Sequence, residues 1–191
     1  MINALIDEIE TCLKQNLYMS SLSLTLILID MCSKVEFSKK QKQSVRYPNW
    51  FDKYVAESMR HFKDKEEDFF VNGEIAYNLR NCVLHDGDPD LKKKKTNVQK
   101  FELLVEDYNR YSHMGTETLV ISHYENGKEK IDSRQIVISL LDFCEKVIAC
   151  VKDYYNKNTQ KFKFNYRVVN ISKSNADMFG IDDGSRYIYK K

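Results

Sequence analysis

Three residues near the middle of the chain carry the side chains that phosphate chemistry requires. They are Arg80, Asn81 and His85, which lie within the stretch from Asn72 to Asp90. A guanidinium supplies a fixed positive charge, an amide orients a neighbouring group, and an imidazole changes its protonation state close to neutral pH. These groups together suit the handling of a phosphate.

The same stretch is predicted to form one amphipathic helix that ends in a polar turn. At about 100° per residue, one side of the helix is apolar and the other is polar. Asn72 is the predicted N-cap, and Gly87 is predicted to end the helix. The apolar side carries Ile75, Ala76, Leu79, Cys82 and Val83, the opposite side carries Glu74, Asn78, Asn81 and His85, and Tyr77 and Arg80 lie between.

The spacing of the three polar residues limits how they can meet. Asn81 and His85 are four residues apart and are therefore neighbours on one helix face. Arg80 precedes His85 by five residues, which is not a same-face spacing in an α-helix. Arg80 is therefore expected to converge with His85 only near the helix end or across a symmetric contact.

At these residues the chain resembles the HEPN family of domains. The run from Arg80 to His85 matches the Arg-Asn-x-x-x-His motif of that family, and the Gly-Glu pair and tyrosine before it and the acidic-glycine turn after it are also similar. The segments SLSLTLILIDMCS and NWFDKYV resemble the first helices of bacterial HEPN-like proteins. The resemblance covers residues 2 to 90, with weaker support from the last long helix.

The resemblance implies a helical bundle that forms a homodimer and cleaves RNA without a metal ion or other cofactor. In that scheme the 2′-hydroxyl of the RNA attacks its own phosphodiester and leaves a cyclic phosphate. His85 is the expected general base or acid, Arg80 holds the scissile phosphate, and Asn81 orients His85 or binds a phosphate oxygen. Glu74 and Tyr77 are the expected supporting residues.

The family also implies a biological setting and a competing function. Many HEPN ribonucleases act in bacterial toxin–antitoxin pairs or antiviral defence, so RNA, a second copy of the chain, and an antitoxin or defence-complex protein are the expected partners. The alternative is a non-catalytic HEPN-like module that binds a protein or nucleotide partner. A third interpretation is a helical structural domain in which Arg80 and His85 are ordinary surface residues.

The size and composition of the chain indicate one soluble domain with a small appendage. The 191 residues are divided here into a helical domain, 1–157, and a tail, 158–191. The net charge is only +2, so any nucleic-acid surface has to be a local patch. Five scattered cysteines without a C-x-x-C pair favour a reducing, cytoplasmic compartment. The apolar run from Leu22 to Ile29 is too short to span a bilayer, so no membrane partner is expected.

The periodicity of the sequence predicts a mainly α fold with a small β-hairpin insertion at 118–132. Helices are expected over 2–15 and 22–31, after Pro48-Asn49, over the motif, and from Ser133 to about Tyr155. The last helix is expected to include Ile136 and Val137 in its apolar stripe. Residues 36–46 are predicted to be a loop, and the tail has patterns of short strands.

Asp30 is out of place at the end of the apolar run 22–31. A carboxylate is costly there unless it is exposed or paired. One interpretation places Asp30 at the solvent end of its helix, and the other pairs it with Arg80 beside the motif.

The densest positive run in the chain, Lys92, Lys93, Lys94 and Lys95, follows His85 closely. It is either a solvated turn or an RNA-binding arm that holds phosphates beside the site, since each such lysine adds salt-dependent affinity.

Other catalytic signatures are missing from the sequence. It has no glycine loop of the nucleotide-binding kinds, no H-E-x-x-H and no G-x-S-x-G. The four histidines lack the spacing of metal ligands. The helix with Arg80 and His85 therefore remains the one chemical lead.

Overall fold

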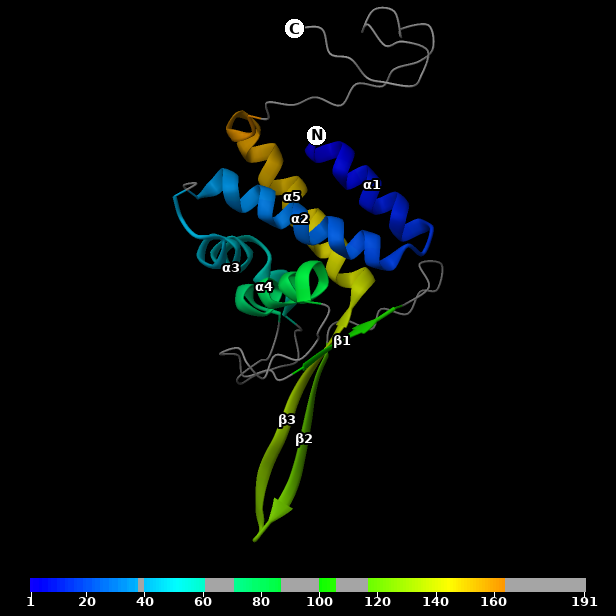
Figure 1. Cartoon of the computed structure of the whole chain (residues 1–191), viewed down its shortest axis with the longest axis vertical. Helices are drawn as coiled ribbons and strands as arrows, with labels where there is room; N and C mark the ends of the chain where they lie inside the picture. The colour runs from blue at the N-terminus through cyan, green and yellow to red at the C-terminus, as the bar shows by residue number, and fades with distance from the viewer. Residues whose placement is uncertain (38–39, 61–70, 87–99, 106–116, 164–191) are drawn as a thin grey trace, which may run out of the picture. The chain divides into compact units, whose positions relative to one another are not determined.

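The computed structural model describes residues 1–37, 40–60, 71–86, 100–105 and 117–163 (Figure 1). Most of these residues are helical, as predicted, and a three-stranded sheet accompanies the helices. Residues Ile2–Phe162 form one compact unit. The predicted strands of the tail fall on residues 164–191, outside the described ranges, so the division at 157 stays a prediction.

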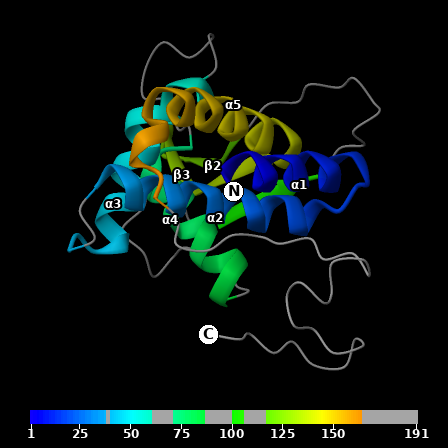
Figure 2. The same ribbon diagram turned by 90° about the horizontal axis from the view of Figure 1, so that it is seen from above.

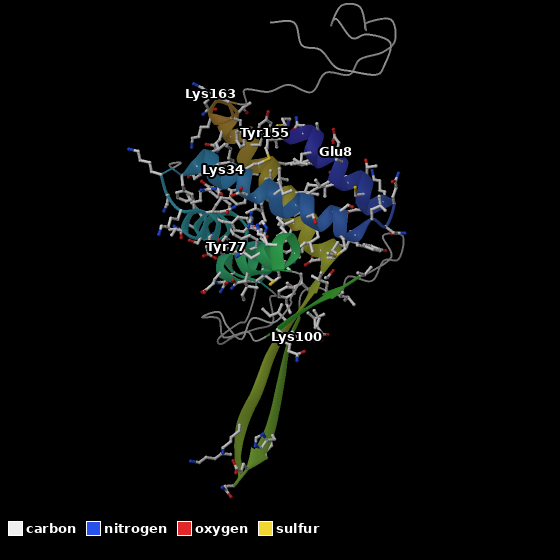
Figure 3. All side chains as sticks on the ribbon, in the orientation of Figure 1. Glu8, Lys34, Tyr77, Lys100, Tyr155 and Lys163 are labelled. Carbon is white, nitrogen blue, oxygen red and sulfur yellow. The ribbon has the colours of Figure 1, made fainter. Side chains whose placement is uncertain are left out.

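The first helix, α1 (Ile2–Lys14), packs on α2 through the stripe that the sequence predicts. The residues of this stripe recur every three or four positions, so they lie on one face of the helix. All of them are buried: Ile2, Ile6, Ile9 and Leu13. The charged residues on the other side of α1, among them Asp7 and Glu8, are exposed (Glu8 is labelled in Figure 3).

The central helix, α2 (Tyr18–Glu36), packs against α1, α3 and α5 and is longer than the predicted 22–31. By length and composition alone, α2 is apolar enough to cross a membrane. However, Leu22, Leu26 and Ile29 are fully buried within the bundle, and the ionic residues in the last two turns form salt bridges. This is the pattern of the core helix of a soluble domain.

Glu36, at the end of α2, ties three parts of the bundle together. Its carboxylate accepts hydrogen bonds from Lys53 (2.6 Å) and Tyr54 (2.7 Å) of α3, from Tyr154 (3.1 Å) of α5, and from Lys161 (3.1 Å) just beyond α5. Burial alone would raise the pKa of this carboxyl, but these four donors outweigh burial and lower the pKa to about 2.

Helix α3 (Gln43–Tyr54) begins five residues before the predicted start at Pro48-Asn49. The predicted loop 36–46 is therefore partly wrong, because the first turn of α3 lies within it. Arg46 and Tyr47 are buried. The helix runs through Pro48, which lacks the N–H for a helical hydrogen bond. The aromatic residues Trp50 and Phe51 are in the core, as predicted.

Helix α4 (Gly73–Asn81) carries the motif and lies against α3 (Figure 2). The predicted N-cap is confirmed, because the side chain of Asn72 accepts a hydrogen bond from the Ile75 amide at 2.9 Å. At Gly73 the two helices approach closely: a Cβ placed there would lie 2.2 Å from the carbonyl oxygen of Pro48. The Gly73 amide also donates to the Asp52 carboxylate at 2.6 Å. Only glycine fits this contact.

The sheet has the strand order β1-β3-β2. Strands β2 (Glu117–Glu125) and β3 (Lys128–Ser139) form the predicted hairpin, extended beyond 118–132. Asn126 and Gly127 connect them with φ values of 52° and 70°, the positive φ pair of a type I′ turn. Strand β1 (Lys100–Leu104) pairs in parallel with the end of β3, which the sequence did not predict.

The last helix, α5 (Leu140–Asn158), begins after its N-cap Ser139 and not after Ser133 as predicted. The assignment of Ile136 and Val137 to the helix is therefore wrong. Both belong to β3, where Ile136 and Ile138 are buried and Gln135 and Val137 are less so. This alternation is typical of a half-buried strand, and pairing with β1 completes it.

Candidate active site

The structure brings Arg80, Asn81 and His85 into direct contact. The Nη1 atom of Arg80 lies 2.9 Å from Oδ1 of Asn81 and 3.0 Å from Nε2 of His85. Arg80 and Asn81 are half-buried in the last turn of α4, whereas His85 is exposed. The cluster thus combines a fixed cation, an amide and an imidazole that faces solvent.

A single π-helical turn, η2 (Cys82–Asp86), explains how residues five apart can meet. In an α-helix, His85 would lie about 140° around the axis from Arg80. In a π-helix the hydrogen bonds run from residue i to i+5, so positions five apart lie near each other. The contact within one chain therefore depends on this wider turn, which the sequence analysis did not foresee.

The contact defines the protonation state of the imidazole. An arginine side chain only donates hydrogen bonds, so Nε2 of His85 must be the acceptor. A hydrogen bond at this distance requires the tautomer with its proton on Nδ1, in which the Nε2 lone pair is engaged by Arg80. A general base at this position has to leave Arg80 before it accepts a proton.

Two buried polar atoms lie behind the cluster. Nε of Arg80 and the hydroxyl of Tyr47 are buried without a hydrogen-bond partner in the described part of the chain. The ring of Tyr47 packs against Tyr77, whose centroid is 5.7 Å away and which is labelled in Figure 3. Burial raises the pKa of Tyr47, with the positive charge of Arg80 opposing this shift and the charge of Asp30 adding to it. Tyr47 is thus close enough to Arg80 to be affected by its charge.

Asp30 does not pair with Arg80, which was one of the two interpretations of this residue. Its carboxylate forms salt bridges with Arg46 at 3.2 Å and Lys34 at 3.1 Å. Burial would raise the pKa of Asp30, but hydrogen bonds from Gln43 and Lys34 and the charges of Lys34 and Arg46 lower it overall. The sequence predicts a loop around Arg46, so it does not indicate that this buried arginine pairs with Asp30.

The two predicted supporting residues differ in their relation to the cluster. Glu74 is exposed in the first turn of α4, where a negative charge suits the positive end of the helix. It makes no hydrogen bond to the motif residues within the described ranges. Tyr77 is half-buried against Tyr47. Asn78, predicted on the polar side, is only 6% exposed, so the covered face of α4 is wider than its apolar stripe.

Two further sequence predictions concern ligands outside this cluster. The lysines of the predicted RNA-binding arm, Lys92, Lys93, Lys94 and Lys95, lie outside the described residues, as does the predicted helix end at Gly87. Within the described ranges, no three His, Cys, Asp or Glu side chains are grouped as ligands for a metal ion.

Comparisons with protein-family models, with curated proteins and with solved structures gave no match to this chain. The resemblance to HEPN domains therefore depends on the motif and the other sequence similarities described above.

Proposed function

We propose that the cluster of Arg80, Asn81 and His85 is the active site of a metal-independent endoribonuclease of the HEPN type. The observation that carries the proposal is the 3.0 Å contact between the Arg80 guanidinium and the His85 imidazole. It places a phosphate-binding cation next to a proton-accepting group, as phosphodiester transfer requires. The described partners of the motif side chains include no carboxylate, so the site favours an anion.

The proposed reaction is an internal transfer at one phosphodiester of RNA. His85 Nε2 takes the proton of the 2′-hydroxyl, and the 2′-oxygen forms a bond to phosphorus. The bond from phosphorus to the 5′-oxygen then breaks, and that oxygen receives a proton from an acid or water. Arg80 stabilises the charge on the phosphate oxygens, and the Nδ2 group of Asn81 is available to donate to one of them.

A homodimer would supply the second proton-transfer group, since each chain contributes one motif histidine. Leu24, Ile27 and Met31 recur along α2 at spacings of three and four, and none of them is buried in the single chain. Ile27 is 40% exposed. In Figure 2 the end of α4 extends on the side of α2 that is opposite α5. These features support pairing of two copies near the motif. A role in bacterial defence or as a toxin follows from the resemblance alone.

The test is an RNA cleavage assay in EDTA with mapped product ends. The wild-type protein is expected to leave 2′,3′-cyclic phosphates, and His85→Ala is expected to abolish cleavage. His123→Ala, which removes an exposed histidine of the hairpin, is the matched control and should cleave normally. Equal cleavage by wild type and His85→Ala would refute the proposal.

One observation favours the alternative of a binding module. The lone pair that a general base needs is engaged by Arg80 in this structure. If RNA stays intact but binds in a way that depends on Arg80, the cluster is an anion-binding site of a non-catalytic HEPN-like module.

A further inference from the structure

We propose that the hydrogen bond from Arg80 to Nε2 of His85 acts as a latch that keeps the lone pair of the base occupied. A phosphate bound to Arg80 opens this latch by displacing the imidazole. This inference rests on the proposed function, because it assumes that the anion bound at Arg80 is a phosphate. It adds a coupling that the motif alone does not contain: the base becomes available only after the phosphate is in place.

Both hydrogens on one nitrogen of the Arg80 guanidinium are already engaged. The Nη1 atom of an arginine carries two hydrogens. One of them is directed to Oδ1 of Asn81 at 2.9 Å and the other to Nε2 of His85 at 3.0 Å. Both hydrogens of Nη1 are therefore in use before any ligand binds.

A phosphate can use only one edge of the Arg80 guanidinium for two hydrogen bonds. Arginine holds phosphate best through two parallel hydrogen bonds from adjacent nitrogens. One possible edge includes Nε, but Nε of Arg80 is buried. The remaining edge is formed by Nη1 and Nη2. A phosphate with two bonds to this edge therefore needs a hydrogen from Nη1.

Of the two acceptors on Nη1, His85 is the one that a phosphate displaces. Asn81 is the neighbour of Arg80 in α4, is half-buried, and is held by the helix backbone. His85 is exposed and lies in the single π turn beyond α4. Because His85 can turn into solvent without uncovering the core, its bond is the one that the phosphate replaces. The released Nε2 lone pair is then free to accept a proton.

The latch makes an unusual prediction for phosphate affinity, because His85 competes with the ligand. We would titrate inorganic phosphate into the full chain by calorimetry at about pH 8, where most imidazole is neutral. His85→Ala is expected to bind phosphate about 3- to 10-fold more tightly than wild type, since no competing hydrogen bond has to be broken. Arg80→Lys should lose most of the binding, and His123→Ala should bind like wild type.

A second readout follows the imidazole directly. In ¹⁵N NMR spectra of the wild type, phosphate should shift the Nε2 signal of His85 toward that of an imidazole free of Arg80. Weaker or unchanged phosphate binding by His85→Ala would overturn the latch, because His85 would then add to the site or play no part in it. An Nε2 signal that phosphate does not move would also overturn it.

The RNA assay tests the ribonuclease and the phosphate titration tests the latch, so either proposal can be refuted without the other. RNA cleavage that depends on His85, without tighter phosphate binding by His85→Ala, refutes the latch and keeps the ribonuclease. Tighter phosphate binding by His85→Ala without RNA cleavage keeps the latch and refutes the ribonuclease.

Discussion

Nη1 of Arg80 and Nε2 of His85 are 3.0 Å apart although the two residues are five positions apart in the sequence. The π turn Cys82–Asp86 makes this contact possible within one chain. Because of this contact, a change at either residue alters the hydrogen bonding of the other.

Replacement of Asn81 by aspartate is expected to weaken RNA binding. The Asn81→Asp variant keeps an oxygen that accepts from Arg80 but adds a negative charge next to the guanidinium. That charge should oppose a phosphate and raise the Kd for a short RNA oligonucleotide about 10-fold, given the strength of charge interactions near a protein surface. Asn81→Ala, which removes the oxygen without adding a charge, is the comparison. Equal Kd values for the two variants would show that charge beside Arg80 does not matter.

Asp30→Asn is expected to reduce stability but leave the site intact. In this variant the buried Arg46 loses its salt bridge with the Asp30 carboxylate. Arg46 still donates a hydrogen bond to the carbonyl oxygen of Gln41 at 3.1 Å. We expect the free energy of unfolding to fall by about 2–3 kcal/mol, below the usual cost of an unpaired buried charge. Urea denaturation measures this change. Lys34→Ala is the control, because Lys34 is half-exposed and its loss should cost at most about 1 kcal/mol.

The same Asp30 variant also separates the two interpretations of this residue. Because Asp30 contacts Arg46 and Lys34, RNA cleavage per folded molecule should equal that of wild type. A selective loss of cleavage in a folded Asp30→Asn protein would instead restore Asp30 as a partner of the motif.

The network at Glu36 should make stability depend on pH in the acid range. The pKa of Glu36 is lowered to about 2 in the folded chain, from 4.5 for a free side chain. The stabilisation from its ionised form is therefore fully present above pH 4.5 and is lost as the pH falls toward 2. Near neutral pH, Glu36→Gln should lower the free energy of unfolding by about 1–3 kcal/mol.

Thermal denaturation of wild type and Glu36→Gln across this pH range provides the measurement. The difference in Tm between the two proteins should shrink steadily below pH 4.5. A difference that stays constant down to pH 2 would mean that the charge of Glu36 contributes nothing to the network.

Gly73→Ala is expected to disturb the motif through the backbone. The added Cβ would lie 2.2 Å from the Pro48 carbonyl oxygen, so α4 has to move away from α3. We expect a loss of about 1–3 kcal/mol in the free energy of unfolding, as for other overpacked contacts. The neighbouring exposed variant Glu74→Ala should stay within about 0.5 kcal/mol of wild type. Equal stability of the two variants would contradict the close approach of the helices.

The helical core was largely predictable because its residues follow a simple period. The stripe of α1 and the N-cap at Asn72 depend on interactions within a few residues, which sequence patterns record directly. Strand β1 and the extension of β3 were not predictable in this way. The run from Gln135 to Ile138 suits a helix or a strand, and only pairing with the distant residues of β1 decides between them.

The candidate site was predictable in its members and not in its geometry. The types and spacing of Arg80, Asn81 and His85 single them out, but α-helical geometry separates Arg80 from His85. The π turn that joins them has no signature in these residues. The pairing of Asp30 was also missed, since Arg46 reaches it from a separate helix.

The parallel pairing of β1 with β3 has a consequence for the order of folding. The hairpin β2–β3 closes through a two-residue turn and is a local, fast step. Lys100, in contrast, pairs with Gln135, so β1 closes a much longer loop and is expected to join the sheet more slowly than the hairpin forms. Until then the end of β3 that leads into α5 has an open edge, at which newly made chains are most prone to associate wrongly.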